Sequence, residues 1–455
     1  MSRAVALLLA LAFVGAVALG VKTMLLGGDG PPNAAPAASF TAVITSPATR
    51  VPPTAAASPT AARQGPSAAA TPDDRGKVLS KVQKGSASIA QIDEMENSYL
   101  IIDHDVPSHY AVDYYRIEFL GSDLDHKPLK LVAQIFVPKA PNAASMPIYV
   151  FGPGTTGLVD ECAPSKEEPN ERSWGDFHSH MLTYGTQGYV SIVPDFEGFN
   201  DGGRIHHYYV GQLQAQVLLD AARAALRFFD EGATAPVAKD NPVFVAGYSH
   251  GGYVALAARD IAHAYAPELH MRGAIGYGPR SDPTTLFREF PALGNYLLYS
   301  YADFYGKEHV PVDRIVRPEW LRTWEKDVTS MCIDEVPDYY GGEPRFVYTN
   351  DFLRAIDAHT MAQDFPQLNA LLAKNKAGLG SPDIPVLVLQ GTDDTVVYPE
   401  TLKTYMREVC ATGARAAYLS YPGMTHTVTR QVSYEDTLLW MSTILRGQAP
   451  WTTCG

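Results

Sequence analysis

The sequence predicts an α/β protein built on a mostly parallel sheet. Short apolar runs rich in β-branched residues, which are typical of strands covered on both faces, alternate with longer segments of helical periodicity. A glycine-rich turn, GYSHG at residues 247–251, stands where one apolar run ends and a helical segment begins. Strands and helices that alternate in this way indicate a parallel sheet with helices on both faces.

The order of the elements follows from these patterns. Polar and apolar residues alternate over residues 110–138 around a turn at 121–126, which predicts a β-hairpin. Further strands are expected at 146–151, 189–194, 242–246, 273–276 and 384–389. Helical periodicity is expected at 211–230 and 252–263.

The N-terminal segment, residues 1–28, indicates export. Arg3 precedes an apolar run from residue 4 to 21. The core of a cleaved signal has about 7–15 apolar residues. A membrane-spanning helix needs about 20, so both a signal peptide and an uncleaved signal anchor stay open. Either one predicts a secreted or cell-envelope protein.

The rest of the chain divides by composition. Residues 29–77 are rich in Pro, Ala, Thr and Ser, and this predicts a disordered linker that buries too little apolar surface to fold. Residues 78–278 and 384–455 are expected to form one core. Residues 279–383 interrupt the strand–helix rhythm with aromatic, helical sequence that includes Trp320 and Trp324, and we expect this insertion to form a cap.

Charge and cysteine content exclude some classes of function. The formal net charge of −13 argues against a nucleic-acid partner. Four cysteines in an exported chain predict two disulfides, with all three pairings open and buried free thiols as the alternative. Neither a CxxC pair nor a Cys/His cluster with metal-ligand spacing occurs in the sequence, so we expect no metal site.

Residues 243–252, VFVAGYSHGG, place a G-x-S-x-G pattern between a strand and a helix. In that context the pattern predicts a nucleophile elbow, a sharp turn that exposes the hydroxyl of Ser249 at the edge of the sheet in the α/β-hydrolase fold. Gly247 and Gly251 remove side chains that would collide with the neighbouring strand and helix. The backbone N–H of His250 begins the helix and is expected to donate to an oxyanion.

The base and the acid follow from chain order, which in this fold is Ser, then Asp or Glu, then His. The strand at 384–389 runs into Asp393 and Asp394, and His426 is the one histidine beyond them. We expect Asp394 to orient His426, and Asp393 to cap the turn.

A second oxyanion donor is expected in the glycine-rich loop after the strand at 146–151. The loop reads FGPGTTG at residues 151–157. Thr155 is the candidate donor, and Gly154 and Thr156 are its alternatives. A loop that is merely flexible is the other interpretation.

Together these motifs resemble the secretory lipase family, which includes the yeast type-A lipases and many bacterial relatives. The resemblance covers about residues 78–455. It rests on GTTG at 154–157, PDFEGFN at 194–200, GYSHGG, AYAPEL at 264–269, QGTDDTVVYP at 390–399 and EVCATGA at 408–414. One departure is GPGTTG, which stands where bacterial members often have HGTTG.

The resemblance implies an α/β-hydrolase core with a helical cap, no cofactor, and hydrolysis of acylglycerols or other carboxylic esters. It assigns the triad to Ser249, Asp394 and His426, and it suggests the pairs Cys162–Cys332 and Cys410–Cys454.

The sequence therefore predicts a secreted serine carboxylic-ester hydrolase that acts on fatty esters through an acyl-enzyme. Its expected partners are a small-molecule or lipid ester and at most a transient lipid surface, with no obligate protein partner. Two alternatives stay open. One is a serine peptidase or acyltransferase with the same triad, and the other is a catalytically silent binding protein.

Overall fold

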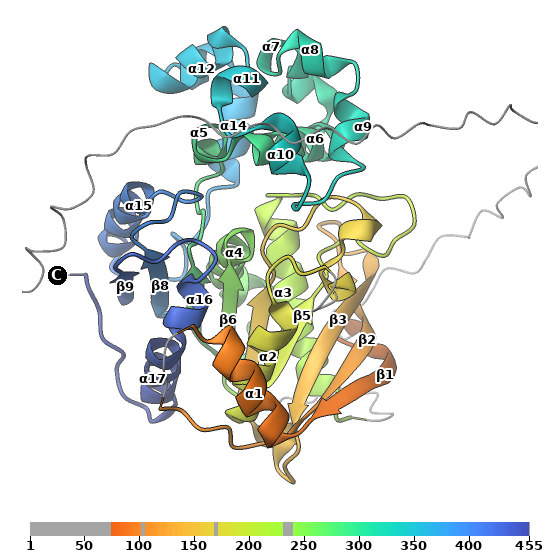
Figure 1. Ribbon diagram of the computed structural model, residues 1–455, viewed down its shortest axis with the longest axis vertical. Coiled ribbons are helices and arrows are strands. Elements are labelled where there is room, and N and C mark those ends of the chain that lie inside the picture. Colours follow the sequence, from red (N-terminus) through yellow and green to blue (C-terminus); the bar gives the residue numbers. More distant parts are fainter. Residues whose placement is uncertain (1–73, 102–104, 168–171, 231–239, 455) are drawn as a thin grey trace, which may run out of the picture. The chain divides into compact units, whose positions relative to one another are not determined.

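The computed structural model of this protein describes residues 74–101, 105–167, 172–230 and 240–454. Within these ranges nine strands form one sheet in the order β1-β2-β3-β5-β4-β6-β7-β8-β9 (Figure 1). The strands are β1 (Val78–Ala87), β2 (Val112–Ser122), β3 (Pro128–Pro138), β4 (Ile148–Gly152), β5 (Val190–Pro194), β6 (Val243–Tyr248), β7 (Met271–Tyr277), β8 (Val386–Gly391) and β9 (Ala416–Tyr421).

The pairing of the strands confirms the predicted α/β fold with a mostly parallel sheet. β1, β2, β3 and β5 pair antiparallel in succession. From β5 through β4 and β6 to β9 every pair is parallel. The predicted hairpin is β2 with β3, in register from Val112↔Pro138 to Ser122↔Pro128. The edge strands β1 and β9 were not expected from the sequence.

Helices cover both faces of the sheet. On β4, Ile148 and Val150 pack in the same core as α3 and α4, whereas Tyr149 and Phe151 pack with α2 and α17 on the opposite face. This alternation buries both faces of the central strands, as the continuous apolar runs predicted. The helices around the sheet are α1 (Ile89–Tyr99), α2 (Phe177–Thr186), α3 (Gly211–Arg227), α4 (His250–Tyr265), α15 (Pro399–Ala411), α16 (Thr429–Val432) and α17 (Tyr434–Leu445).

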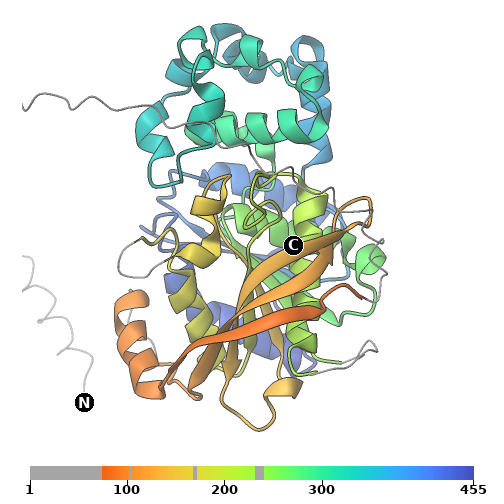
Figure 2. The ribbon, with the colours of Figure 1, turned by 90° about the vertical axis from the view of Figure 1, so that its right-hand side faces the viewer.

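The segment predicted as a cap, residues 279–383, consists mainly of short helices that lie together at one end of the sheet (Figures 1 and 2). They are α5 (Leu286–Glu289), α6 (Pro291–Tyr305), α7 (Val312–Ile315), α8 (Pro318–Leu321), α9 (Trp324–Val328), α10 (Val336–Tyr340), α11 (Pro344–Val347), α12 (Asn350–Asp357), α13 (Met361–Asp364) and α14 (Pro366–Lys374). We refer to this segment as the insertion; its role as a cap stays a prediction.

Two disulfides join segments that are far apart in the sequence. Cys162, in the loop after β4, is bonded to Cys332 of the insertion, and Cys410 of α15 is bonded to Cys454 near the C-terminus. These are the pairs that the resemblance suggested. The first one closes a long loop between core and insertion, and such cross-links disfavour the unfolded chain.

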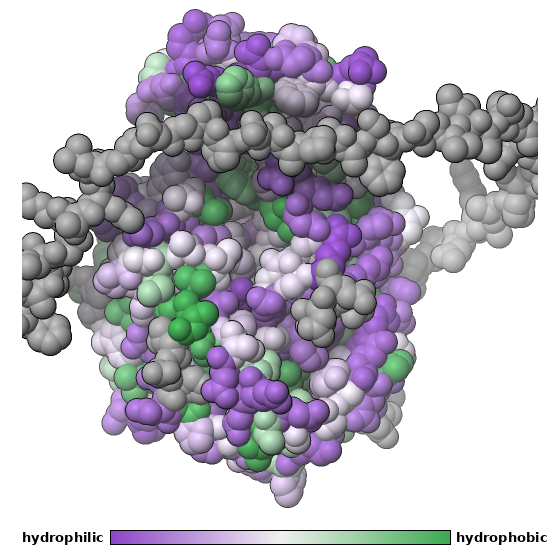
Figure 3. Space-filling view, viewed as in Figure 1, coloured by the Kyte–Doolittle hydropathy of each residue, from purple (hydrophilic) through white to green (hydrophobic). Residues whose placement is uncertain are grey.

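The predicted signal segment, residues 1–28, and the linker, residues 29–77, lie outside the described residues except for 74–77. Gly76, within that last stretch, already donates its N–H to the carbonyl of Leu120 in β2. None of the helices in the described ranges has the length and apolar character of a membrane span. On the face in Figure 3, polar side chains cover most of the insertion, and an apolar patch lies near α16.

Glu96 on α1 makes the stability of the fold dependent on pH. Its side chain is buried, one carboxylate oxygen accepts from Ser108 Oγ at 3.2 Å, and the other has no partner among the described residues. Burial raises the pKa of Glu96 from 4.5 to about 7. The folded state therefore binds this proton more tightly than the unfolded state, and stability is lost as the pH rises through 7.

We expect Glu96→Gln to stabilise the protein at pH 8 by about 1–2 kcal/mol, because the amide removes the buried charge. The difference should disappear near pH 4.5, where the unfolded carboxyl also takes up its proton. Denaturant unfolding at both pH values measures it. The exposed neighbour Glu94 is the control, and Glu94→Gln should give no such pH-dependent difference. Equal effects of the two substitutions would contradict the assignment.

Candidate active site

Ser249 lies on a sharp turn between β6 and α4. Its backbone has φ 54° and ψ −116°, in a region that side-chain-bearing residues rarely adopt. The N–H of Ser249 donates to the carbonyl of Tyr277, the last residue of β7, at 2.8 Å. This is the predicted geometry of a nucleophile elbow.

Close contact between backbone segments explains the two glycines of the elbow. A Cβ atom on Gly247 would lie 2.1 Å from the carbonyl oxygen of Gly251. A Cβ atom on Gly251 would lie 1.9 Å from the carbonyl oxygen of Gly152, the last residue of β4. Backbone atoms cannot move aside as the end of a side chain can. Both positions therefore require glycine, as the motif predicted.

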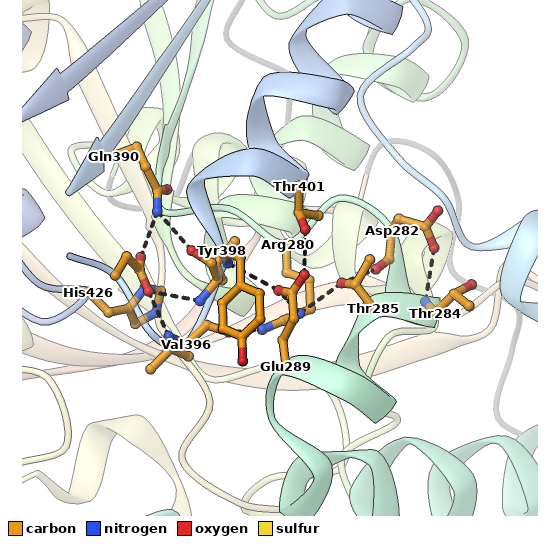
Figure 4. A network of polar contacts seen from close by, with 12 residues as sticks. Arg280, Asp282, Thr284, Thr285, Glu289, Gln390, Val396, Tyr398, Thr401 and His426 are labelled. Atoms are coloured by element: carbon orange, nitrogen blue, oxygen red, sulfur yellow. Dashed lines mark hydrogen bonds and ion pairs between the residues drawn. The ribbon is translucent and has the colours of Figure 1, made fainter. Parts of the chain in front are cut away.

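The structure brings Asp394 and His426 together. The two residues are 3% and 5% exposed. His426 Nδ1 lies 2.6 Å from Asp394 Oδ2 (Figure 4). Asp394 Oδ1 accepts the N–H groups of Val396 and Val397, both at 2.8 Å. Asp393, by contrast, is exposed and accepts from the hydroxyl of Thr392. The choice of Asp394 over Asp393 thus agrees with the geometry.

His426 lies beside the elbow. Its ring packs against the ring of Tyr248, with centroids 4.9 Å apart. Its Cε1 and Nδ1 atoms are 2.9 Å from the position that a Cβ atom on Gly278 would take. Gly278 follows Tyr277, and the carbonyl of Tyr277 accepts the N–H of Ser249. The end of β7 therefore contacts both the imidazole and the elbow.

The hydrogen bond between His426 and Ser249 is not formed in this structure. Nε2 of His426 is buried and has no hydrogen-bond partner among the described residues. Of the predicted triad, the structure therefore joins the acid to the base but not the base to the nucleophile. Catalytic hydrogen bonds of unliganded sites are often long and shorten when substrate binds.

The predicted oxyanion donors lie around the same turn. The side chain of His250 is buried, with Nε2 3.1 Å from Gln214 Oε1, so its backbone N–H at the start of α4 is the group available to a ligand. Gly154 packs on the ring of Tyr248, and the hydroxyl of Thr155 is 2.7 Å from Tyr208 OH. The loop thus borders the elbow, and the role of Thr155 as second donor stays a prediction.

His207, in the pair His206–His207, links the core to the insertion. Its Nε2 is 3.1 Å from Asp303 Oδ2 on α6, and its Nδ1 is 3.3 Å from the buried carboxylate of Glu197. Burial by itself lowers the pKa of His207, but Glu197 and Asp303 outweigh it, and the pKa is raised. Its ring nitrogens face these two carboxylates, and it precedes Ser249 in the sequence, so it does not fit the chain order from which the base was predicted.

Gln390 and Arg430 contribute to the site but were missed in the sequence. The amide of Gln390 donates to Asp394 Oδ2 at 2.9 Å, and the guanidinium of Arg430 lies 4.3 Å from the ring centroid of Tyr248. Both side chains are buried. A polar residue at the end of the apolar run VLVLQ is a signal that could have identified Gln390. Arg430 has no comparable signal.

The described ranges contain one group of potential metal ligands, Cys332, Asp334 and Glu335. The sulfur of Cys332 is bonded to Cys162, and both carboxylates form ion pairs with Arg172. These contacts occupy the ligand atoms, so the group fits a structural role better than a metal site.

Comparison with known proteins agrees with this geometry. A model of the family described as secretory lipase matches residues 179–452, more than half of the chain. The secreted triacylglycerol lipase LIP4 of Malassezia globosa is 26% identical over 359 residues, which cover 75% of this chain and 73% of the relative.

Two solved structures show the same fold. The X-ray structure of Candida antarctica lipase A has a TM-score of 0.60 at 19% identity and covers 84% of each chain. The rice cell wall degrading esterase LipA of Xanthomonas oryzae has a TM-score of 0.62 at 17% identity, over 82% of this chain and 98% of that one. The fold is therefore that of the α/β-hydrolases.

The two neighbouring aspartates allow a matched test of the acid. We expect Asp394→Asn to lower kcat by about 10³–10⁴, because the amide cannot stabilise an imidazolium and favours the wrong tautomer. Asp393→Asn makes the same chemical change at an exposed position and should alter kcat by less than about threefold. Steady-state hydrolysis of a chromogenic ester measures both. A greater loss in Asp393→Asn would refute the choice of acid.

Proposed function

Because this chain belongs to the secretory lipase family, we propose that it hydrolyses carboxylic esters through an acyl-enzyme formed on Ser249. The family and the α/β-hydrolase fold make it a carboxylic ester hydrolase of the lipase and esterase class. The observation that best supports the residue assignment is the buried contact between His426 and Asp394 beside the strained turn at Ser249.

In the proposed mechanism His426 Nε2 takes the proton of the Ser249 hydroxyl as its oxygen attacks the ester carbonyl. Asp394 accepts a hydrogen bond from Nδ1–H and stabilises the imidazolium. The N–H of His250 and a donor in residues 154–156 bind the oxyanion. The C–O bond to the alcohol then breaks, and the alcohol leaves with the proton from His426. Water releases the acid by the same steps.

The unpartnered Nε2 of His426 supports this assignment of the base. This atom is buried and has no hydrogen-bond partner among the described residues, and it belongs to the ring that packs beside the elbow. The acid fixes the other ring nitrogen, so Nε2 is left free to accept a proton. In the proposed mechanism this nitrogen receives the proton of the Ser249 hydroxyl when a substrate binds.

For the substrate class we propose fatty esters, acylglycerols among them. The relative from Malassezia globosa is named a triacylglycerol lipase. The insertion is rich in aromatic side chains, and two of them, Tyr339 and Phe346, are 43% and 54% exposed. Exposed aromatic groups suit a transient contact with a lipid surface. We propose that the insertion is the cap that supplies the acyl pocket, and that the protein acts after export.

The test is a panel of esters of increasing acyl length, an amide of matched structure, and an ester with added alcohol. We expect ester turnover, a preference for longer acyl chains, and covalent labelling of Ser249 by a fluorophosphonate. Ser249→Ala should lose the label and at least about 10³-fold in kcat. Faster cleavage of the amide would indicate a peptidase, and transfer to the alcohol an acyltransferase. Absence of both label and turnover would indicate a silent protein.

A further inference from the structure

Arg280 and Glu289 form a buried ion pair close to the candidate catalytic acid. Arg280 follows β7, and Glu289 is the last residue of α5, the first α-helix of the insertion. Arg280 is 3% exposed and Glu289 9%, and Nη1 lies 2.7 Å from Oε2. The same nitrogen donates to Thr285 Oγ1 at 2.7 Å. Both residues therefore lie in the first part of the insertion, shortly after β7, the strand that ends beside His426.

Both charges bind the segment that follows Asp394. Arg280 Nη2 donates to the carbonyl of Val396. Glu289 accepts the N–H of Tyr398 at 3.2 Å and the hydroxyl of Thr401. Figure 4 shows these contacts as one continuous network that reaches His426.

Asp394 and Gln390 bind further backbone groups of the segment that follows Asp394. Asp394 Oδ1 accepts the N–H groups of Val396 and Val397. Gln390 bridges Asp394 Oδ2 and the carbonyl of Val397, with 2.9 Å to each. Residues 396–398 are therefore held between the ion pair and the acid, and a displacement on one side is passed to the other.

Packing alone could not replace this pair. A buried ion pair contributes little to stability, since desolvation offsets the attraction, and apolar residues of similar size are often as good. Apolar residues would, however, leave the carbonyl of Val396 and the N–H of Tyr398 without these partners. The two charged side chains therefore bind one backbone acceptor, the carbonyl of Val396, and one backbone donor, the N–H of Tyr398.

We propose that Arg280 and Glu289 are positioning residues of the triad. They fix residues 396–398, so that Asp394 holds the imidazole of His426 in the orientation that serves Ser249. The orientation of Asp394 thereby depends on the position of α5, the first α-helix of the insertion. This inference rests on the function proposed above, and the pair acts through Asp394 without touching the substrate.

The double variant Arg280→Met/Glu289→Leu tests the proposal, because it removes both side-chain contacts to residues 396–398 without leaving a single buried charge. We expect kcat to fall about 10–100-fold, as for other small displacements of catalytic groups, with KM within about threefold. In proton NMR, the low-field resonance of the His426 Nδ1–H bonded to Asp394 should shift or broaden.

A second buried pair serves as the control. Arg223 Nη1 lies 2.6 Å from Asp220 Oδ1 on α3. Asp220 also accepts from the hydroxyl of Tyr265, the last residue of α4. The length of α4 separates that residue from the elbow by about 22 Å. Asp220→Leu/Arg223→Met should change stability but neither kcat nor the imidazole resonance.

The proposal is overturned if the Arg280/Glu289 double variant keeps both kcat and the resonance, or if the control variant lowers kcat equally. If the double variant does not fold, Arg280→Lys replaces it. Lysine keeps the charge but lacks the planar fork that binds Glu289, Thr285 and Val396 together, so kcat should fall about 3–10-fold and the resonance should shift. Unchanged values overturn the proposal.

The function and the positioning role fail separately. Lack of ester turnover and of fluorophosphonate labelling in the unaltered protein would reject the function. The imidazole resonance reports the Asp394–His426 contact without any turnover.

Discussion

Contact between backbone and backbone at the start of α4 is the constraint on which the site depends. The helix begins so close to β6 and to the end of β4 that Gly247, Gly251 and Gly152 meet through main-chain atoms alone. This packing holds Ser249 in a conformation with positive φ, and it brings the loop that contains Thr155 next to the first N–H groups of the helix. A side chain at either elbow glycine would separate the parts that must meet.

Side-chain and backbone hydrogen bonds, and not backbone packing, hold the acid and the base. Asp394 is surrounded by donors from its own loop and from Gln390, and each of its oxygens has two partners. These contacts fix the position of the carboxylate beside the imidazole. His426 has one nitrogen bonded to this carboxylate, and the other has no partner in the part of the chain that the structure describes. Arg430, which follows in α16, packs over Tyr248, the residue whose ring contacts the imidazole.

The insertion is attached to the core at points close to this site. The disulfide Cys162–Cys332 anchors it to the loop after β4, His207 reaches Asp303 on α6, and Glu289 on α5 binds the segment after Asp394. A covalent bond, an ion pair with a histidine and a buried network thus all join the insertion to the core.

The sequence by itself determined the class of fold, the elbow around Ser249, and the choice of His426, because strand–helix alternation, glycine spacing and chain order are local or ordinal properties. It also favoured Asp394 over Asp393, although two adjacent aspartates differ little in what the sequence pattern indicates. Only the tertiary structure decided the rest: the edge strands β1 and β9, the burial of Gln390 and Arg430, and the network from Arg280 to Asp394. These features depend on contacts between residues far apart in the chain, and a local sequence pattern does not indicate which distant residues will meet. The same holds for the hydrogen bond that is not formed between His426 and Ser249, since such a bond depends on atomic positions that chain order does not specify.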